Sequence, residues 1–238
     1  MLNKFLACAL AALCLAISAA RADEAEIKKS VAVLYGSNVK VNAVRKAEAL
    51  GLYEVQIGNE ILYSDEKGSY FVQGDIIDVK GHLNLTEARR NKLAQIKFSE
   101  LPLELAVKTV RGNGKRVFAS FEDPNCGYCK KLAKELVGIT DFTMYTFMIP
   151  ILSADSGEKS KAIWCAADRS KSWNDWMVNG IEPQAATCAT PIDKLLALSQ
   201  KLNVRGTPAI FFSNGERIPG FVPAAKLDQE LNRIAALK

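Results

Sequence analysis

The chain has 238 residues, of which 31 are Lys or Arg, 26 are Asp or Glu, one is His and six are Cys. Hydrophobic residues make up 49% of the sequence, and Gly and Pro occur at ordinary frequency. This composition excludes a disordered or collagen-like chain and supports one or two folded domains. A single His excludes multi-histidine metal sites, and a net charge of +5 is too small to indicate nucleic-acid binding.

The first 22 residues have the three parts of a secretory signal peptide. Lys4 supplies the positive end, residues 5–20 are apolar, and Ala20-Arg21-Ala22 is a small-residue cleavage signal. We therefore expect cleavage after Ala22 and export. Export exposes the remaining cysteines to an oxidising compartment, where thiols pair unless something keeps them reduced. Those cysteines are Cys126, Cys129, Cys165 and Cys188.

Residues 23–83 show a short helical start and then short alternating runs separated by turn residues. The runs predict strands over residues 52–57, 60–63, 69–73 and 76–79, a pattern typical of an antiparallel meander. A unit of this size without a disulfide or metal is marginally stable alone and often gains stability by oligomerising. We therefore predict a dimerisation domain.

A helix is expected over residues 85–98, inside a linker that spans residues 84–101. Thr86 is its predicted N-cap, and Pro102 lies just beyond its end. Its apolar stripe is thin and consists of Ala88, Leu93 and Ile96. A helix that buries so little is typical of a spacer between domains, although a solvated surface helix of one larger domain is an alternative.

Residues 102–238 change to an α/β pattern with a mixed sheet. Strands are expected over residues 116–121, 142–148, 209–213 and 216–221, with helical stretches between them and a last helix that starts at Pro223. Asn214-Gly215, between the last two strands, is the sequence that a two-residue type I′ turn prefers.

The motif Cys126-Gly127-Tyr128-Cys129 lies between a predicted strand and a predicted helix, so it opens the helix. Unpaired backbone N–H groups and the helix dipole there stabilise a thiolate over a thiol. We predict Cys126 as the nucleophile and Cys129 as the more buried resolving thiol that attacks a mixed disulfide. Zinc binding by all four cysteines is less favoured because the other two lie far apart in sequence. A purely structural Cys126–Cys129 bond would constrain the unfolded chain little.

Cys165 and Cys188 flank a helical excursion rich in polar residues. A bond between them could contribute about 3 kcal/mol to stability by closing this loop, and a second redox relay is the alternative. Glu122 and Asp123 could place a carboxylate near the thiols and accept a proton from Cys129, whereas a solvated turn is the alternative. His82 is far in sequence from Cys126, so a Cys-His protease has little support and a surface position is expected.

A Cys-x-x-Cys after a first strand, followed much later by Gly-Thr-Pro before a hairpin and a helix, resembles the thioredoxin fold. Further likeness is carried by residues 126–132, 161–166, 206–209, 213–215 and 218–221, and by Cys188. Through these residues the chain resembles, more specifically, the DsbC family of periplasmic disulfide isomerases. The resemblance implies an α+β N-terminal dimerisation domain, a linker helix, and an α/β thioredoxin-like catalytic domain with a helical insertion.

The resemblance also implies which residues act. Thr207-Pro208 would be a cis-proline loop beside Cys126, and Tyr128 would join Thr207 and Pro208 in contacting an extended substrate segment. Cys165 and Cys188 match the family's structural disulfide.

The partners that the resemblance implies are a second copy of the chain in a V-shaped homodimer, misfolded disulfide-containing exported proteins, and the membrane reductase DsbD as electron donor. No cofactor, metal or nucleic acid is expected. The approach Asp123-Pro124-Asn125 is similar to that of the sister protein DsbG. A DsbG-like periplasmic reductase or chaperone is therefore the alternative function, and the predicted N-terminal meander argues against a monomeric oxidase.

Overall fold

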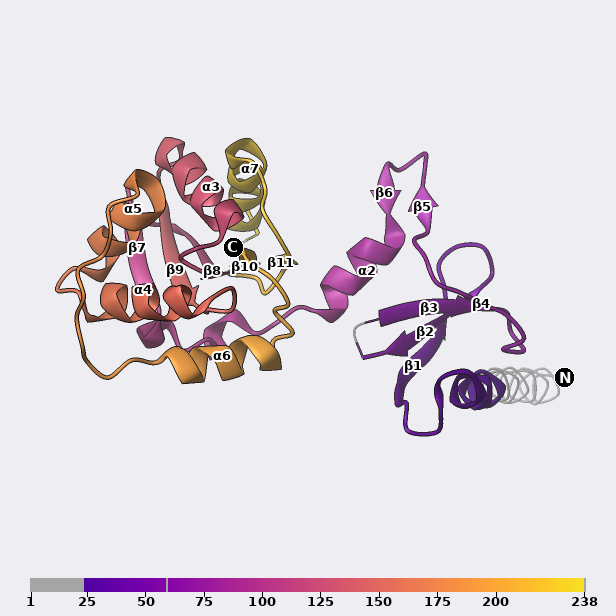
Figure 1. Cartoon of the computed structure of the whole chain (residues 1–238). Coiled ribbons are helices and arrows are strands. Elements are labelled where there is room, and N and C mark those ends of the chain that lie inside the picture. Colours follow the sequence, from indigo (N-terminus) through magenta and orange to yellow (C-terminus); the bar gives the residue numbers. More distant parts are fainter. Residues whose placement is uncertain (1–23, 59, 238) are drawn as a thin grey trace, which may run out of the picture. The chain divides into compact units, whose positions relative to one another are not determined.

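The computed structural model describes residues 24–58 and 60–237 (Figure 1). The chain divides into two compact units, and the boundary between them along the sequence falls between Leu93 and Ala94. The predicted signal peptide and its cleavage after Ala22 lie outside the described residues. Among the described residues, no helix combines the length and the apolar character needed to cross a membrane.

The N-terminal unit is built on a four-stranded antiparallel sheet in the order β1-β2-β3-β4. The strands are β1 (Val41–Lys46), β2 (Tyr53–Ile57), β3 (Glu60–Ser64) and β4 (Phe71–Val72), and a short hairpin of β5 (Ile77–Asp78) and β6 (Leu83–Asn84) follows. The predicted meander is confirmed for β2, β3 and β4, with β1 as an additional strand, whereas the strand predicted over residues 76–79 lies outside this sheet and pairs with β6.

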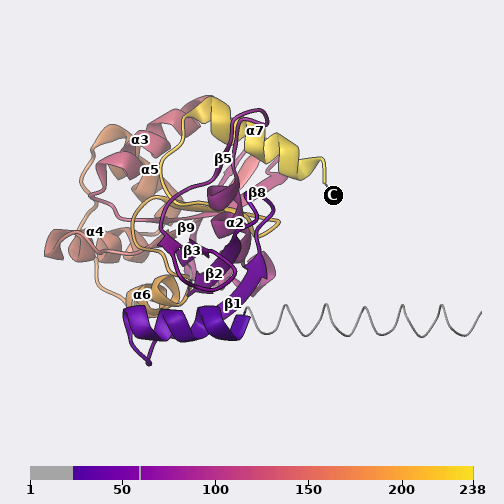
Figure 2. The same ribbon diagram turned by 90° about the vertical axis from the view of Figure 1, so that its right-hand side faces the viewer.

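Residues 24–35 form a helix that supplies one side of this unit's core. Its Ile27 and Val31 are fully buried against Val55 and Leu62 of the sheet. Figure 2 shows this helix in indigo beside β1. The apolar positions four residues apart lie on one face of the helix, so a single short helix is enough to cover the sheet.

Helix α2 (Leu85–Leu93) ends five residues before the predicted end of the helix at residue 98. Its cap is Asn84, whose Oδ1 accepts the Glu87 N–H at 2.8 Å. The predicted cap, Thr86, is wrong because its side chain is buried on the inner face of the helix. There the hydroxyl bonds to the Tyr63 hydroxyl at 2.6 Å and accepts the Ile76 N–H at 2.9 Å, which attaches α2 to the sheet.

A buried carboxylate also joins α2 to the sheet. Glu54 on β2 accepts two hydrogen bonds from Arg45, at 2.7 and 2.6 Å, and one from Arg89 of α2, at 3.0 Å. Burial alone would raise the pKa of Glu54, but the bonds and charges of the two guanidinium groups lower it below its usual value. The carboxylate therefore stays charged and paired, and it fixes α2 on β1 and β2.

The C-terminal unit contains a five-stranded mixed sheet in the order β11-β10-β8-β9-β7. The strands are β7 (Val107–Arg111), β8 (Arg116–Glu122), β9 (Phe142–Met148), β10 (Ala209–Phe212) and β11 (Arg217–Ile218). Strands β8 and β9 are parallel, and the other neighbours are antiparallel. The mixed sheet expected for this part of the chain is confirmed, with β7 as an additional edge strand.

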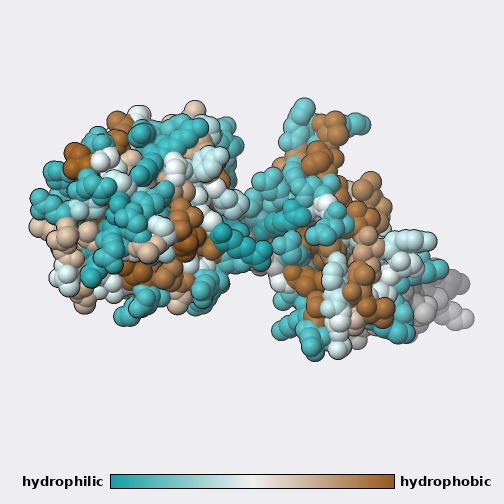
Figure 3. All heavy atoms as spheres, in the orientation of Figure 1, coloured by the Kyte–Doolittle hydropathy of each residue, from teal (hydrophilic) through white to brown (hydrophobic). Residues whose placement is uncertain are grey.

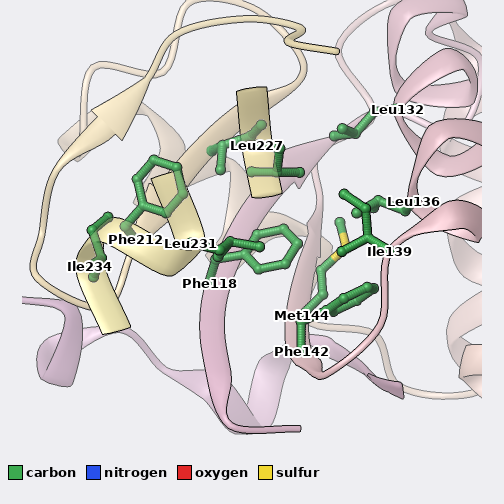
Figure 4. Close-up of a cluster of buried hydrophobic side chains, with 11 residues drawn as sticks. Phe118, Leu132, Leu136, Ile139, Phe142, Met144, Phe212, Leu227, Leu231 and Ile234 are labelled. Atoms are coloured by element: carbon green, nitrogen blue, oxygen red, sulfur yellow. The ribbon is translucent and has the colours of Figure 1, made fainter. Parts of the chain in front are cut away.

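Helices cover both faces of this sheet. On one face, α3 (Gly127–Glu135) and α7 (Ala224–Ala235) pack on Phe118, Phe142 and Phe212, which point toward them (Figure 4). On the other face, α6 (Ile192–Lys201) shares a core with Phe121, Phe147 and Phe211. The strand period of two sends alternate side chains to the two faces, which produces both cores.

The insertion between β9 and β10 begins with α4 (Ala154–Cys165) and α5 (Arg169–Asn179). These helices form a third core with α3, in which Trp173, Trp176 and Met177 are buried together with both cysteines of the motif. The insertion therefore packs directly against the start of α3.

The β10–β11 hairpin differs from the predicted type I′ turn. The Phe212 carbonyl accepts the Gly215 N–H at 2.9 Å, and Gly215 has a φ of 87° whereas Asn214 does not have a positive φ. This is a three-residue loop with glycine in the left-handed bulge position. A Cβ at Gly215 would collide with the carbonyl oxygen of Ile96, whose N–H donates to the Gly215 carbonyl at 3.1 Å.

Candidate active site

Cys126 is the N-cap of α3, at the end of the turn that follows β8. Its side chain is 7% exposed, and its thiol donates to the carbonyl oxygen of Thr207 at a distance of 3.3 Å. The first N–H groups of a helix have no partner within the helix, and the helix dipole favours negative charge there. A thiol in this position is suited to act as a nucleophile.

The Thr207–Pro208 peptide bond is cis, as the family resemblance implied. Pro208 is buried and Thr207 is half-buried. The segment comes from the end of the insertion, 81 residues after Cys126, and the fold brings the Thr207 carbonyl against the Cys126 sulfur.

Cys129 lies in the first turn of α3 and is fully buried, and both cysteines of the motif are free thiols. Burial raises the pKa of Cys129 far above its usual value, and the charges of Glu122 and Cys126 raise it further. Cys129 therefore keeps its proton until a base accepts it.

Glu122 is the last residue of β8 and is 1% exposed. Within the described part of the chain, neither of its carboxylate oxygens accepts a hydrogen bond of good geometry. Burial raises the pKa of Glu122 to about 8, against a smaller opposing effect of the Ser120 hydroxyl. A carboxyl group with this pKa can gain or lose a proton near neutral pH.

Asp123 is also buried, but its carboxylate is fully occupied by hydrogen bonds. One oxygen accepts the Asn125 N–H and the Ser156 hydroxyl, each at 2.8 Å. The other accepts the N–H groups of Ile151 and Leu152, at 2.8 and 3.0 Å. The alternative of a solvated turn is wrong for Glu122 and Asp123, and the bonding of Asp123 indicates an anchor rather than a proton acceptor.

Two contacts that sequence reasoning missed attach the insertion to this turn. The Trp176 indole N–H donates to the Pro124 carbonyl at 2.6 Å, and the Asn125 side-chain amide donates to Asp155 at 2.7 Å. The ammonium groups of Lys130 and Lys159 lie 3.8 and 4.7 Å from the centre of a Trp176 ring. Nothing in the local sequence signals these contacts, because the partners lie at least 30 residues apart.

The comparisons with known proteins agree with this geometry. Residues 18–87 match the family described as disulfide bond isomerase protein N-terminal domain, and residues 103–235 match a thioredoxin-like domain. The probable thiol:disulfide interchange protein DsbC of Bordetella pertussis is 51% identical over 191 residues, which cover 80% of this chain and 68% of that protein. DsbC of Escherichia coli is 32% identical over 220 residues, 90% of this chain and 89% of that protein.

The chain belongs to the DsbC family. It is a thiol-disulfide oxidoreductase with a DsbC-type N-terminal domain and a thioredoxin-like domain. The crystal structure of a disulfide interchange protein from Neisseria gonorrhoeae has the same fold, with a TM-score of 0.55 and 38% identity. It matches 56% of this chain and 97% of that chain.

Tyr128, the third residue of the Cys-Gly-Tyr-Cys motif, is 64% exposed two residues after Cys126. Its ring lies 6.1 Å from that of Phe221, and the Lys131 ammonium group lies 4.4 Å from the centre of the Phe221 ring. Tyr128 is therefore accessible from solvent beside the two thiols.

Cys165 and Cys188 form a disulfide that joins the end of α4 to the loop before α6. The zinc alternative, which needed all four cysteines at one site, is not supported. The part of the chain that the structure describes holds no group of three or more His, Cys, Asp or Glu suited to a metal ion. His82 is exposed, as expected, and lies in the N-terminal unit rather than with Cys126.

Proposed function

We propose that this member of the DsbC family isomerises and reduces non-native disulfides in exported proteins, with Cys126 as the nucleophile. The Cys126 thiolate attacks one sulfur of a wrong disulfide, a Cys126–substrate S–S bond forms, and the other substrate sulfur leaves as a thiolate. That thiolate attacks another disulfide of the substrate. A substrate thiolate finally displaces Cys126, so isomerisation transfers no net electrons.

Reduction is the second outcome of the same intermediate. If the substrate stalls, the Cys129 thiolate attacks Cys126, a Cys126–Cys129 disulfide forms, and the substrate leaves with two thiols. Two electrons have then passed to the substrate, and an outside reductant must restore the enzyme. The membrane reductase DsbD is the donor we propose, on family resemblance.

Glu122 is the proposed proton acceptor for Cys129. Three features support this role of Glu122. Both groups are buried, the pKa of Glu122 is about 8, and the charge of Glu122 raises the pKa of the Cys129 thiol. Transfer of the Cys129 proton to Glu122 would create the thiolate that resolves the mixed disulfide without bringing water into the core.

The observation that carries the proposal is the juxtaposition of a helix-capping free thiol, a carbonyl at 3.3 Å and a second free thiol one turn further on. We propose that the backbone at Thr207 and Pro208 binds an extended substrate segment, with Tyr128 contacting its side chains. The Cys165–Cys188 disulfide takes the structural role.

We also propose a periplasmic homodimer joined through the N-terminal unit. Export is supported by the predicted signal peptide. Dimerisation is supported by the exposed apolar side chains of Ile77, Val79 and Leu83 in and beside the β5–β6 hairpin, and by Val72 on the edge strand β4. Figure 3 shows brown, hydrophobic residues beside teal, hydrophilic ones on the hairpin.

The deciding experiment is recovery of activity from a scrambled multi-disulfide protein under weakly reducing conditions. The wild-type protein is expected to restore activity, and Cys126→Ala is expected to restore none because no mixed disulfide can form. Circular dichroism of Cys126→Ala provides the folding control. Isomerisation by Cys126→Ala would refute the assignment. If the folded wild-type protein restored nothing, the exposed apolar residues of the N-terminal unit would favour a DsbG-like reductase or chaperone.

A further inference from the structure

The loop between β9 and α4 presents two adjacent aliphatic side chains to solvent. Ile151 is 44% exposed and Leu152 is 57% exposed. Single exposed aliphatic residues are common on protein surfaces and need no explanation. This pair is unusual because the backbone N–H groups of both residues donate hydrogen bonds to the Asp123 carboxylate, in the turn that leads into Cys126.

The loop is fixed to the turn along its whole length. The Ile149 N–H donates to the Glu122 carbonyl at 2.8 Å, and the Asn125 side-chain amide donates to the Ser153 hydroxyl at 3.3 Å. Ser153 also caps α4 by accepting the Ser156 N–H at 3.1 Å. Rearranging the loop to bury its side chains would leave the buried Asp123 carboxylate without two donors.

The same contacts place the pair close to the nucleophile. Asn125 directly precedes Cys126, and the Cys126 N–H donates to the Asp123 carbonyl at 3.0 Å. The acidic side chain nearest in sequence, Asp155, is paired with Lys159 at 2.8 Å, so it leaves little net charge beside the loop. An exposed aliphatic pair gains free energy when an apolar side chain covers it.

We propose that Ile151 and Leu152 form a subsite for an apolar side chain next to the substrate cysteine that bonds to Cys126. The occupant is an extended, apolar segment of an unfolded substrate chain, because hydrogen bonds hold the pair on the turn that leads into Cys126, to which that chain becomes bonded. Substrate cysteines that have apolar neighbours in sequence therefore react faster with Cys126 than substrate cysteines with polar neighbours. This inference rests on the proposed function of Cys126.

The test measures the rate at which Cys126 forms its mixed disulfide with a peptide. It uses the full chain with Cys129→Ala, so that no second thiol resolves the mixed disulfide. Two peptides are compared, and each contains one Cys that is joined to thionitrobenzoate by a disulfide bond. The residues on either side of this Cys are Leu in one peptide and Ser in the other. The Cys126 thiolate attacks the peptide sulfur, a Cys126–peptide S–S bond forms, and coloured thionitrobenzoate leaves as the thiolate. Its release gives the rate.

We expect about tenfold faster reaction with the Leu peptide, which corresponds to covering one aliphatic side chain. Ile151→Ser with Leu152→Ser should remove this preference by lowering the Leu-peptide rate to about that of the Ser peptide. Val137→Ser is the matched control, since Val137 is similarly exposed but lies beyond the C-terminal end of α3, and it should keep the preference. A preference that survives the double substitution, or is absent from the parent, overturns the inference. Failure of both peptides to react would instead overturn the role of Cys126.

Discussion

At the scale of single residues, the buried Glu122 gives the stability of the protein a pH dependence. Burial raises its pKa from 4.5 to about 8 in the folded protein. Between these two values the folded state binds more protons than the unfolded state, so the free energy of unfolding falls as pH rises. The contribution of Glu122 is therefore complete below the unfolded pKa and is lost as pH rises through the folded pKa.

Glu122→Gln should flatten this dependence because an amide does not titrate. We expect the variant to match the wild type near about pH 4 and to be more stable above about pH 8, by on the order of 5 kcal/mol. Urea unfolding of the reduced proteins at the two pH values measures the difference. Glu104→Gln, which changes an exposed carboxylate of the same unit, is the control and should retain the wild-type slope. An unchanged slope in Glu122→Gln would show that the folded protein does not hold Glu122 at a raised pKa.

The sequence could predict that Cys126 and Cys129 are the reactive thiols. It could not predict that the carboxyl groups of Glu122 and Asp123 are buried. A run of Glu, Asp, Pro and Asn is typical of a solvated turn. Asp123 is buried where the β9–α4 loop, about thirty residues later, supplies two N–H donors to its carboxylate. Glu122 is buried in the same region of the fold as Ala133 of α3 and Trp173 of α5. Only tertiary structure brings these partners together.

At the scale of helices and strands, prediction succeeded where one pattern dominated. Strands β8, β9 and β10 are long apolar runs and were predicted, whereas the edge strands β1 and β7 mix valine with Asn, Lys, Thr and Arg and were missed. The predicted linker helix was too long because Ile96 extends its apolar stripe. In the structure, Ile96 bonds to Gly215 of the hairpin instead.

That contact makes Gly215 more sensitive than an ordinary turn glycine. Gly215→Ala must place a Cβ at a φ of 87° and against the Ile96 carbonyl, so we expect a loss of about 2–4 kcal/mol in the free energy of unfolding. Gly220→Ala is the matched control because a Cβ there meets nothing within 4 Å, and it should change stability little. Thermal unfolding of both variants makes the comparison, and equal stability would show that the hairpin does not pack on Ile96.

The disulfide of the insertion should matter for stability more than for the first chemical step. Replacing Cys165 and Cys188 together by Ser removes a bond that spans 23 positions, and we expect a loss of about 3 kcal/mol on the loop-entropy model. Urea unfolding measures the loss, and alkylation of Cys126 by iodoacetamide reports its reactivity. A variant as stable as the wild type, with altered Cys126 reactivity, would favour the alternative of a second redox relay.

At the scale of the whole molecule, each unit has its own core, and among the described residues the cysteines lie in the C-terminal unit. The described part of the N-terminal unit therefore contributes to function in some way other than thiol chemistry. Its exposed apolar hairpin is costly in water for a monomer and favourable in an assembly, which is the physical basis of the proposed dimer.

Ile77→Asp with Val79→Asp should therefore make the protein monomeric. Both side chains are exposed, so the charges leave the core of the unit intact but oppose burial of the hairpin in an interface. Sedimentation equilibrium should give half the mass of the wild type, while Val110→Asp, an exposed change in the C-terminal unit, should leave the mass unchanged. The monomer should still release thionitrobenzoate through Cys126, because its active site is complete within one chain. If it also loses recovery of the scrambled protein, then isomerisation requires two chains to hold one substrate, whereas a fully active monomer would show that one chain is sufficient.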